Sequence, residues 1–130
     1  MSSIFSKIVQ GEIPCHKIAE DDQFLAFLDV MPLVEGHTLV IPKQEIDYVF
    51  DLDPEVLAGL MKFAQRIAPA IKKAIPCKRI GVAVIGLEVP HAHVHLVPLN
   101  RMLDINFYQE KLKPSQESLA KTAELIRSFI

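Results

Sequence analysis

Apolar residues recur at helical spacing in three stretches of the chain. The first, from Ile4 to Val9, lies before the breaker Gly11 and predicts a short N-terminal helix. The second begins at Asp53-Pro54-Glu55, a helix start signal, and runs to about Lys73. An interior proline costs about 3 kcal/mol, so Pro69 is expected to kink or shorten its last turn. The third helix is predicted from Ser115 to Ile130. The predicted inward faces are Leu57, Leu60, Met61, Ala64, Ile67, Ala68 and Ile71, then Leu119, Ala123, Ile126 and Ile130.

Shorter apolar runs, rich in β-branched and aromatic residues, predict five strands. A polar turn at 21–23 joins the first two, Gly86 begins a bend before the fifth, and the return from Met102 to Leu112 is irregular. Strands that follow one another with helices inserted favour an α+β fold with an antiparallel sheet, one face of which is covered by helix. We expect one domain over residues 1–130. The predicted strands are Cys15–Glu20, Phe24–Asp29, His37–Pro42, Lys78–Ile85 and Val89–Val97.

The composition narrows the classes of function and location. The 130 residues carry a formal net charge of −2, so the chain lacks the basic footprint of a protein that binds polymeric nucleic acid. No apolar run approaches the ~20 residues that span a bilayer. Cys15 and Cys77 have neither paired spacing nor a secretory leader beside them. These features predict a soluble, cytoplasmic protein without a membrane or nucleic-acid partner.

The segment VPHAHVHLV, from Val89 to Val97, contains three of the five histidines. On a strand, His91, His93 and His95 would project from one face, because successive side chains point to opposite sides. The row admits three explanations. It could bind a metal, it could provide an attacking imidazole with supporting neighbours, or it could be part of a core in which each imidazole needs a polar partner.

Other residues could complete a site around these histidines. His37 starts a strand and could approach the row, and the bend at Gly86 could turn backbone N–H groups toward an anion. Asp29 at a strand end could accept hydrogen bonds from a vicinal diol. An apolar slot could be formed by Ile4, Phe5, Ile8 and Phe27. An acceptor for a diol, an apolar slot, a backbone bend that can bind an anion and a row of imidazoles together suggest a nucleotide ligand.

Two segments identify a family. HAHVHLV resembles the histidine triad signature, and IFSKIVQGEIP with EDDQFLAFLDVMPLVEGHTLVIPK is similar to the N-terminal half of the same proteins. The resemblance covers about three quarters of the chain. It implies an α+β subunit with a five-stranded antiparallel sheet and a homodimer in which the two sheets join. It also implies nucleotidyl hydrolase or transferase activity on nucleoside phosphoramidates, acyl adenylates or dinucleoside polyphosphates.

The resemblance also implies roles for individual residues. His93 corresponds to the nucleophile that takes the nucleotidyl group, and His91, His95 and His37 match the supporting histidines. Asp29 matches the acid that binds ribose. The residues that match the base pocket are Ile4, Phe5, Ile8, Phe27, Leu28 and Val30. The rival hypothesis is a purine-nucleotide-binding regulatory protein with little turnover, and a metalloenzyme is a third possibility.

The chain departs from the family pattern in two places. Before the triad, RIGVAVIGLEVPH keeps Gly86 but has Leu87 where the family carries glutamine, and Glu88 follows. A carboxylate near a transferring phosphate is repulsive unless it contacts a cationic leaving group. Glu88 is therefore included among the substrate-binding candidates, with a preference for amine conjugates.

The second departure concerns a metal. Many bacterial relatives bind a structural zinc through a Cys-x-x-Cys pair and downstream histidines, but the matching positions here are Ser3, Ser6 and Gln44-Glu45. Because thiolate ligands are absent, we expect no structural zinc, and no cofactor.

Overall fold

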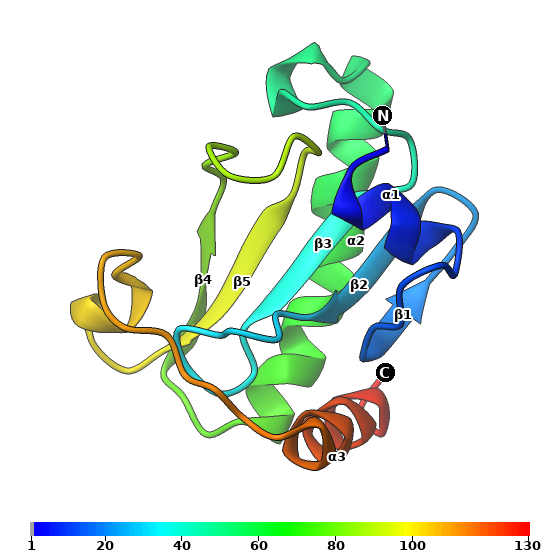
Figure 1. Ribbon diagram of the computed structural model, residues 1–130. Helices are drawn as coiled ribbons and strands as arrows, with labels where there is room; N and C mark the ends of the chain where they lie inside the picture. Colours follow the sequence, from blue (N-terminus) through cyan, green and yellow to red (C-terminus); the bar gives the residue numbers. More distant parts are fainter. Residues whose placement is uncertain (1) are drawn as a thin grey trace.

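The computed structural model describes residues 2–130, which form a five-stranded sheet with helices on both sides (Figure 1). All neighbouring strands are antiparallel, in the order β1-β2-β3-β5-β4. The predicted α+β class and antiparallel sheet are confirmed. The elements are α1 (Ile4–Val9), β1 (Lys17–Glu20), β2 (Phe24–Leu28), β3 (Thr38–Pro42), α2 (Pro54–Ala74), β4 (Arg79–Ala83), β5 (Val94–Leu99) and α3 (Gln116–Arg127), with short 3₁₀ turns η1 (Val49–Asp51) and η2 (Met102–Ile105).

Alternation along the central strands divides the core between the two faces of the sheet. Phe24, Ala26 and Leu28 of β2 face α2 and α3, in one cluster with Val40, Val94 and Leu96. Leu25 and Phe27 face the other side, in a second cluster with Leu39, Ile41 and Phe5 of α1. Figure 1 shows α2 behind β2 and β3, and α1 in front of them. Both faces of β2 are thus covered, not one face as expected, which explains why this strand is apolar at every position.

The long helix α2 is not shortened at Pro69, because the helix continues through that residue to Ala74. Pro69 and Gln65 are both exposed, so the Gln65 carbonyl that loses its intrahelical donor can be hydrated. Met61 was placed on the inward face, yet it is 42% exposed.

The C-terminal helix α3 is shorter than predicted. Ser115 is its N-cap, accepting from the Ser118 N–H at 3.0 Å, and the helix ends at Arg127. Ile130 therefore lies beyond the inward face and is 49% exposed. Leu119, Ala123 and Ile126 are buried in the core as expected. Within residues 2–130, no helix combines the length and apolar composition needed to cross a membrane.

Candidate active site

The histidine segment is not a strand along its whole length. His95 lies on β5 opposite Leu39, whereas His91 and His93 precede the strand, which starts at Val94. Pro90 has no N–H to donate, and the Ala92 N–H donates to the Ile46 carbonyl at 2.7 Å rather than to β3. The predicted strand Val89–Val97 is thus wrong in its first half, although all three imidazoles are buried.

His93 has one nitrogen fixed and the other open. Its Nδ1 donates to the His91 carbonyl at 2.7 Å, since a carbonyl can only accept. The neutral ring then carries its lone pair on Nε2. Among residues 2–130, no hydrogen bond reaches that atom, and every fully buried side-chain nitrogen or oxygen has a partner. Nε2 of His93 is therefore the nitrogen available to attack an electrophile.

A second chain of hydrogen bonds fixes the tautomers of His37 and His95. The Leu33 N–H donates to Nδ1 of His37 at 3.0 Å, so the proton of the neutral His37 ring is on Nε2. That Nε2 lies 2.9 Å from Nδ1 of His95 and donates to it. The remaining proton of neutral His95 is consequently on Nε2, where it can donate to a ligand.

Both of these imidazoles are neutral near pH 7. Burial, with the charges of His95, Lys111 and His93, lowers the pKa of His37 to about 3. Burial lowers the pKa of His95 to about 4, with His93 and Lys111 contributing in the same direction. The pair offers an N–H donor to a ligand, but it supplies no positive charge.

His91 joins the histidine segment to α1. Its Nε2 donates to the Pro42 carbonyl at 2.8 Å, which leaves Nδ1 to accept from the Ser3 hydroxyl, also at 2.8 Å. Ser3 is the N-cap of α1 and accepts from the Ser6 N–H at 2.9 Å. Burial lowers the pKa of His91, while the Pro42 carbonyl and the charge of Glu45 oppose this shift.

Glu45 closes this network from the surface. Its Oε1 accepts from the Ser3 N–H at 2.5 Å and from the Ser6 hydroxyl at 2.7 Å. These hydrogen bonds, with the backbone donor first, lower the pKa of Glu45 to about 2. Ser3, Ser6 and Glu45 stand where many bacterial relatives have zinc ligands. In this protein hydrogen bonds connect these three residues next to His91.

Some of the side chains predicted to form an apolar slot pack together. Phe5 packs edge-on against Phe27 at 5.5 Å and against His93 at 5.1 Å, measured between ring centroids. Ile8 is half-buried beside them. Ile4 and Val30, by contrast, are about half exposed, at 50% and 51%. The structure does not bring Leu28 to the slot, because its side chain packs on the opposite face of the sheet with the α2 cluster.

Asp29 follows β2 and lies beside His37. Its N–H donates to the His37 carbonyl at 3.0 Å, and its Oδ1 accepts from the Met31 N–H at 2.9 Å. Its Oδ2 lies 3.8 Å from Nε2 of His37. Burial raises the pKa of Asp29. The hydrogen bond from the Met31 N–H and the charge of Lys111 lower this pKa, but by less. The side chain is 21% exposed, so a ligand hydroxyl can reach it.

The bend at Gly86 has the backbone expected of glycine, with φ at 76°. A Cβ at this position would meet no atom within 4 Å, so only the backbone conformation favours glycine here. Leu87 is 88% exposed and Glu88 is also exposed. The charge of Glu88 acts on Asp29, whose pKa it helps to raise.

One set of donor atoms has metal-like spacing. Single ligand atoms of Asp29, His37 and His95 lie within 4.8 Å of one another. However, Nε2 of His37 and Nδ1 of His95 share a proton in their hydrogen bond. A cation bound by these two atoms would have to displace that proton, and the hydrogen bond satisfies both nitrogens without a metal.

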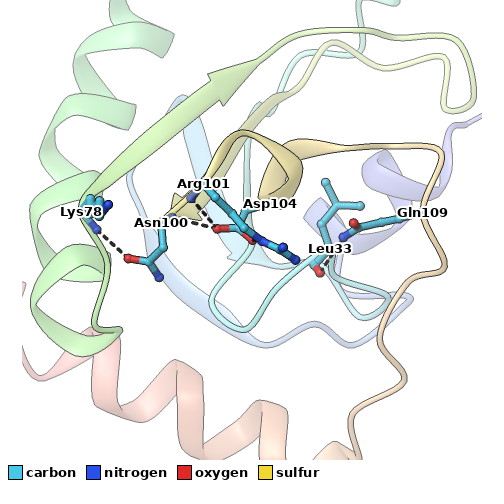
Figure 2. A network of polar contacts seen from close by, with 6 residues as sticks. All are labelled: Leu33, Lys78, Asn100, Arg101, Asp104 and Gln109. Carbon is cyan, nitrogen blue, oxygen red and sulfur yellow. Dashed lines mark hydrogen bonds and ion pairs between the residues drawn. The ribbon is translucent and has the colours of Figure 1, made fainter.

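The return segment after β5 closes one side of the site, and sequence reasoning missed it. Phe107 packs edge-on against His95 at 4.9 Å and against His37 at 6.3 Å. Figure 2 shows Gln109 reaching Leu33, whose carbonyl accepts at 3.3 Å, and Asp104 holding the turn after β5 through Arg101 and Asn100. An irregular segment has no periodicity from which these contacts could be predicted.

A cavity of about 340 Å³ borders Asp29 and His37 on the side of α3. The loop before β3, the segment around Lys113 and the first turns of α3 form its other walls. His91, His93 and His95 do not line it. The cavity is thus a neighbour of the histidine site rather than its centre.

The geometry provides a nitrogen with a free lone pair, a hydrogen-bond donor and an aromatic wall in one place. His93 Nε2 has the lone pair, His95 Nε2 has the proton, and the rings of Phe5 and Phe27 lie beside them. Nucleophile, donor and apolar wall are the parts that transfer of a group from an aromatic ligand requires.

Named relatives match this chain over most of its length. It is 33% identical over 132 residues to an adenylylsulfatase HINT3 of Arabidopsis thaliana, covering 98% of this chain and 66% of that protein. It is 37% identical over 99 residues to the adenosine 5'-monophosphoramidase hnt1 of Schizosaccharomyces pombe, covering 75% of this chain and 74% of that protein.

Solved structures agree with the sequence matches. A Hit-like protein involved in cell-cycle regulation from Bartonella henselae superposes with a TM-score of 0.86 at 34% identity, covering 99% of this chain and 97% of that one. A zinc-bound histidine triad family protein from Mycobacterium smegmatis gives 0.81 at 32% identity, covering 99% and 93%.

The family model described as the HIT domain matches residues 10–102, a range that contains the β2–β3 hairpin, Asp29, His37 and the whole histidine segment. The motif, the sheet and the full-length superpositions therefore agree, and the chain belongs to the histidine triad (HIT) family.

Proposed function

We propose that the protein is a nucleotidyl hydrolase or transferase that acts on nucleoside phosphoramidates or related nucleotide conjugates through a covalent intermediate on His93. The observation that carries this proposal is the hydrogen bond from His93 Nδ1 to the His91 carbonyl, which leaves the lone pair on an unpartnered Nε2. The relatives named as monophosphoramidase and adenylylsulfatase support hydrolysis of nucleotide conjugates at the level of the family.

In the proposed reaction, Nε2 of His93 attacks the α-phosphorus, and a bond from nitrogen to phosphorus forms as the bond to the leaving group breaks. His95 Nε2–H and the backbone near Gly86 hold the phosphate oxygens while the leaving group departs with a proton taken from solvent, and the attacking water returns a proton to solvent in the second step. Water then attacks the phosphorus, the bond to His93 breaks, and the mononucleotide is released. The lone pair on Nε2 suits this role, because an imidazole is both a nucleophile and a good leaving group.

Asp29 binds the ribose diol in this proposal, and the base lies in the slot of Phe5, Ile8 and Phe27. Ile4 and Val30 can contact the base only from the rim, as both side chains are half exposed. Leu28 can contribute only through its backbone, since its side chain faces α2. Glu88, on the bend after Gly86, would contact the leaving group.

The test is incubation with adenosine phosphoramidate, followed by detection of AMP and of an acid-labile nucleotidyl adduct on the protein. We expect turnover and adduct with the wild-type protein and loss of both in His93→Ala. His16→Ala is the matched control, because the exposed His16 side chain is hydrogen-bonded to Gln116 of α3 and not to the other histidines. Full turnover by His93→Ala would overturn the mechanism. Nucleotide binding without turnover by the wild-type protein would favour the regulatory, purine-binding alternative.

We also propose a homodimer joined at β4, the outer strand of the sheet next to β5. An apolar groove of about 400 Å³ lies between β4 and α2, lined by Met61, Ala68, Ile80 and Val82 among others. An open strand edge beside an apolar groove invites pairing with a second copy. Light scattering should give twice the chain mass, and Val82→Lys should reduce it; a wild-type monomer at micromolar concentration would exclude this interface.

A further inference from the structure

The hydrogen bonds of the supporting histidines leave no place for an added proton. His37 accepts from the Leu33 N–H at its Nδ1 and donates from its Nε2 to Nδ1 of His95. A proton added to Nδ1 of His37 would set two N–H groups against each other at Leu33. A proton added to Nδ1 of His95 would do the same between the two rings. The pair therefore keeps its hydrogen bonds only while both imidazoles are neutral.

One side chain of the segment between η2 and α3 covers this pair. The half-buried Phe107 ring packs edge-on against His95 at 4.9 Å and against His37 at 6.3 Å. Apart from His93, it is the only aromatic ring within residues 2–130 that contacts either imidazole. His37 and His95 are only 1% and 9% exposed. Removal of the Phe107 ring would therefore open the pair to water.

Hydrogen bonds on both sides of Phe107 hold it in this place. The Asn106 side chain accepts from the Tyr108 N–H at 3.0 Å, and the Asn106 carbonyl accepts from the Gln109 N–H at 3.2 Å. The Gln109 side chain donates to the Leu33 carbonyl at 3.3 Å, as Figure 2 shows. Leu33 thus anchors the segment through its carbonyl, while its N–H holds the histidine pair.

Burial is the main reason why the pair is neutral. It is the largest cause of the low pKa values of His37 and His95, about 3 and about 4. The charges of His93 and Lys111 act on both pKa values in the same direction, and His95 also acts on His37. The Asp29 carboxylate lies 3.8 Å from Nε2 of His37. Since burial is the largest cause, the protonation of the pair depends first on the side chains that keep water away from it.

We propose that Phe107 is a positioning residue for the nucleotidyl transfer. It keeps water away from His37 and His95 and so holds them in the neutral, hydrogen-bonded form in which Nε2–H of His95 is free to donate to a phosphate oxygen. This role rests on the proposed function, in which that N–H binds the phosphate. Phe107 acts through the two imidazoles and not by contact with the reacting atoms.

The test is an NMR titration of the imidazole nitrogens in ¹⁵N-labelled protein without substrate. In the wild-type protein, His95 should stay mostly neutral down to about pH 5, with its proton on Nε2. In Phe107→Ala, the midpoint of the His95 titration should move up by at least about 1 pH unit, because water then solvates the charged ring. Phe107→Leu should titrate like the wild type, since its side chain is also apolar.

Tyr108→Ala is the matched control, because it removes the neighbouring aromatic ring, which is fully exposed. This variant should leave the His95 titration unchanged. An unchanged titration in Phe107→Ala, or an equal shift in Tyr108→Ala, would overturn the role of Phe107.

Turnover of adenosine phosphoramidate connects the pair to the reaction. After subtraction of uncatalysed hydrolysis, the ratio of kcat/KM at about pH 5 to that at about pH 7.5 should be at least about twofold lower in Phe107→Ala than in the wild type. The reason is that the added proton breaks the hydrogen bond that orients His95. A loss of the same size at both pH values would overturn the positioning role. A wild-type protein without turnover would overturn the proposed function, while the NMR titration would still decide whether Phe107 keeps the pair neutral.

Discussion

At the scale of single residues, hydrogen bonds determine what each histidine can do. The three residues of the motif look equivalent in the sequence, yet each has a different partner: a carbonyl for His93, a serine and a carbonyl for His91, and His37 for His95. A backbone carbonyl can only accept and a backbone N–H can only donate, so these partners decide which nitrogen is protonated. Reactivity is thus assigned by the surroundings of the imidazoles.

Ser3 performs two tasks, and its removal should show both. It caps α1 and donates to buried His91, so Ser3→Ala should lower the free energy of unfolding by about 2–3 kcal/mol, the cap and an unsatisfied acceptor together. Ser115→Ala removes only a cap, that of α3, and should cost about 1 kcal/mol. Urea denaturation measures both values. Equal losses in the two variants would mean that the contact of Ser3 with His91 adds no stability.

At the scale of elements, the strands were predicted well where turns and alternation coincide. The β2–β3 pair matches its predicted position because the 21–23 turn precedes it and Pro42 ends it. The histidine strand was misplaced, since alternation of His91 and His93 continues into a segment that Pro90 and the Ile46 carbonyl hold outside the sheet. Periodicity describes the side chains and does not show which backbone groups are paired.

Part of the candidate site could also be predicted from the sequence. The family motif gave the histidines and Asp29, and the helical spacing gave Phe5 and Ile8. The sequence could not show that the Leu28 side chain faces α2, because a strand with both faces buried has no polar side to mark its orientation. Phe107 contacts His95 and His37 from an irregular segment whose position depends on tertiary contacts.

The turn that presents His37 depends on a glycine. Gly36 has φ at 89°, and a Cβ there would lie 2.7 Å from Cγ1 of Ile75. Gly36→Ala should therefore destabilise the fold by about 2–4 kcal/mol, from backbone strain and overpacking together. Gly11→Ala should cost about 1 kcal/mol, as φ is 80° but a Cβ would meet nothing within 4 Å. Thermal unfolding of the two variants checks the difference, which similar melting temperatures would disprove.

At the scale of the whole molecule, burying neutral imidazoles links stability to pH. The unfolded chain binds protons at His37 and His95 near pH 6.5, whereas the folded chain does so only near 3 and 4. Between these values the unfolded state binds more protons. The stabilisation that comes from these two neutral histidines is complete above about pH 6.5 and is lost as the pH falls.

The expected result is a fall in the free energy of unfolding of at least about 1 kcal/mol between pH 7 and pH 5, where most carboxylates stay ionised. Urea titrations at several pH values measure this slope. The raised pKa of Asp29 acts in the opposite direction, at lower pH. His37→Gln should flatten the slope, and a wild-type protein equally stable at both pH values would contradict the neutral, buried pair.

The position of α1 links Phe5 to the orientation of His93. A helix of six residues is not stable by itself in water, so α1 depends on its contacts with the rest of the molecule. Its Ser3 holds His91, whose carbonyl orients His93, and its Phe5 lies against the His93 ring. Local opening of α1 would therefore release the slot and the nucleophile together. In the proposed reaction, a base bound against Phe5 would shift the population toward the closed conformation in which His93 is oriented, so the substrate would organise the proposed nucleophile.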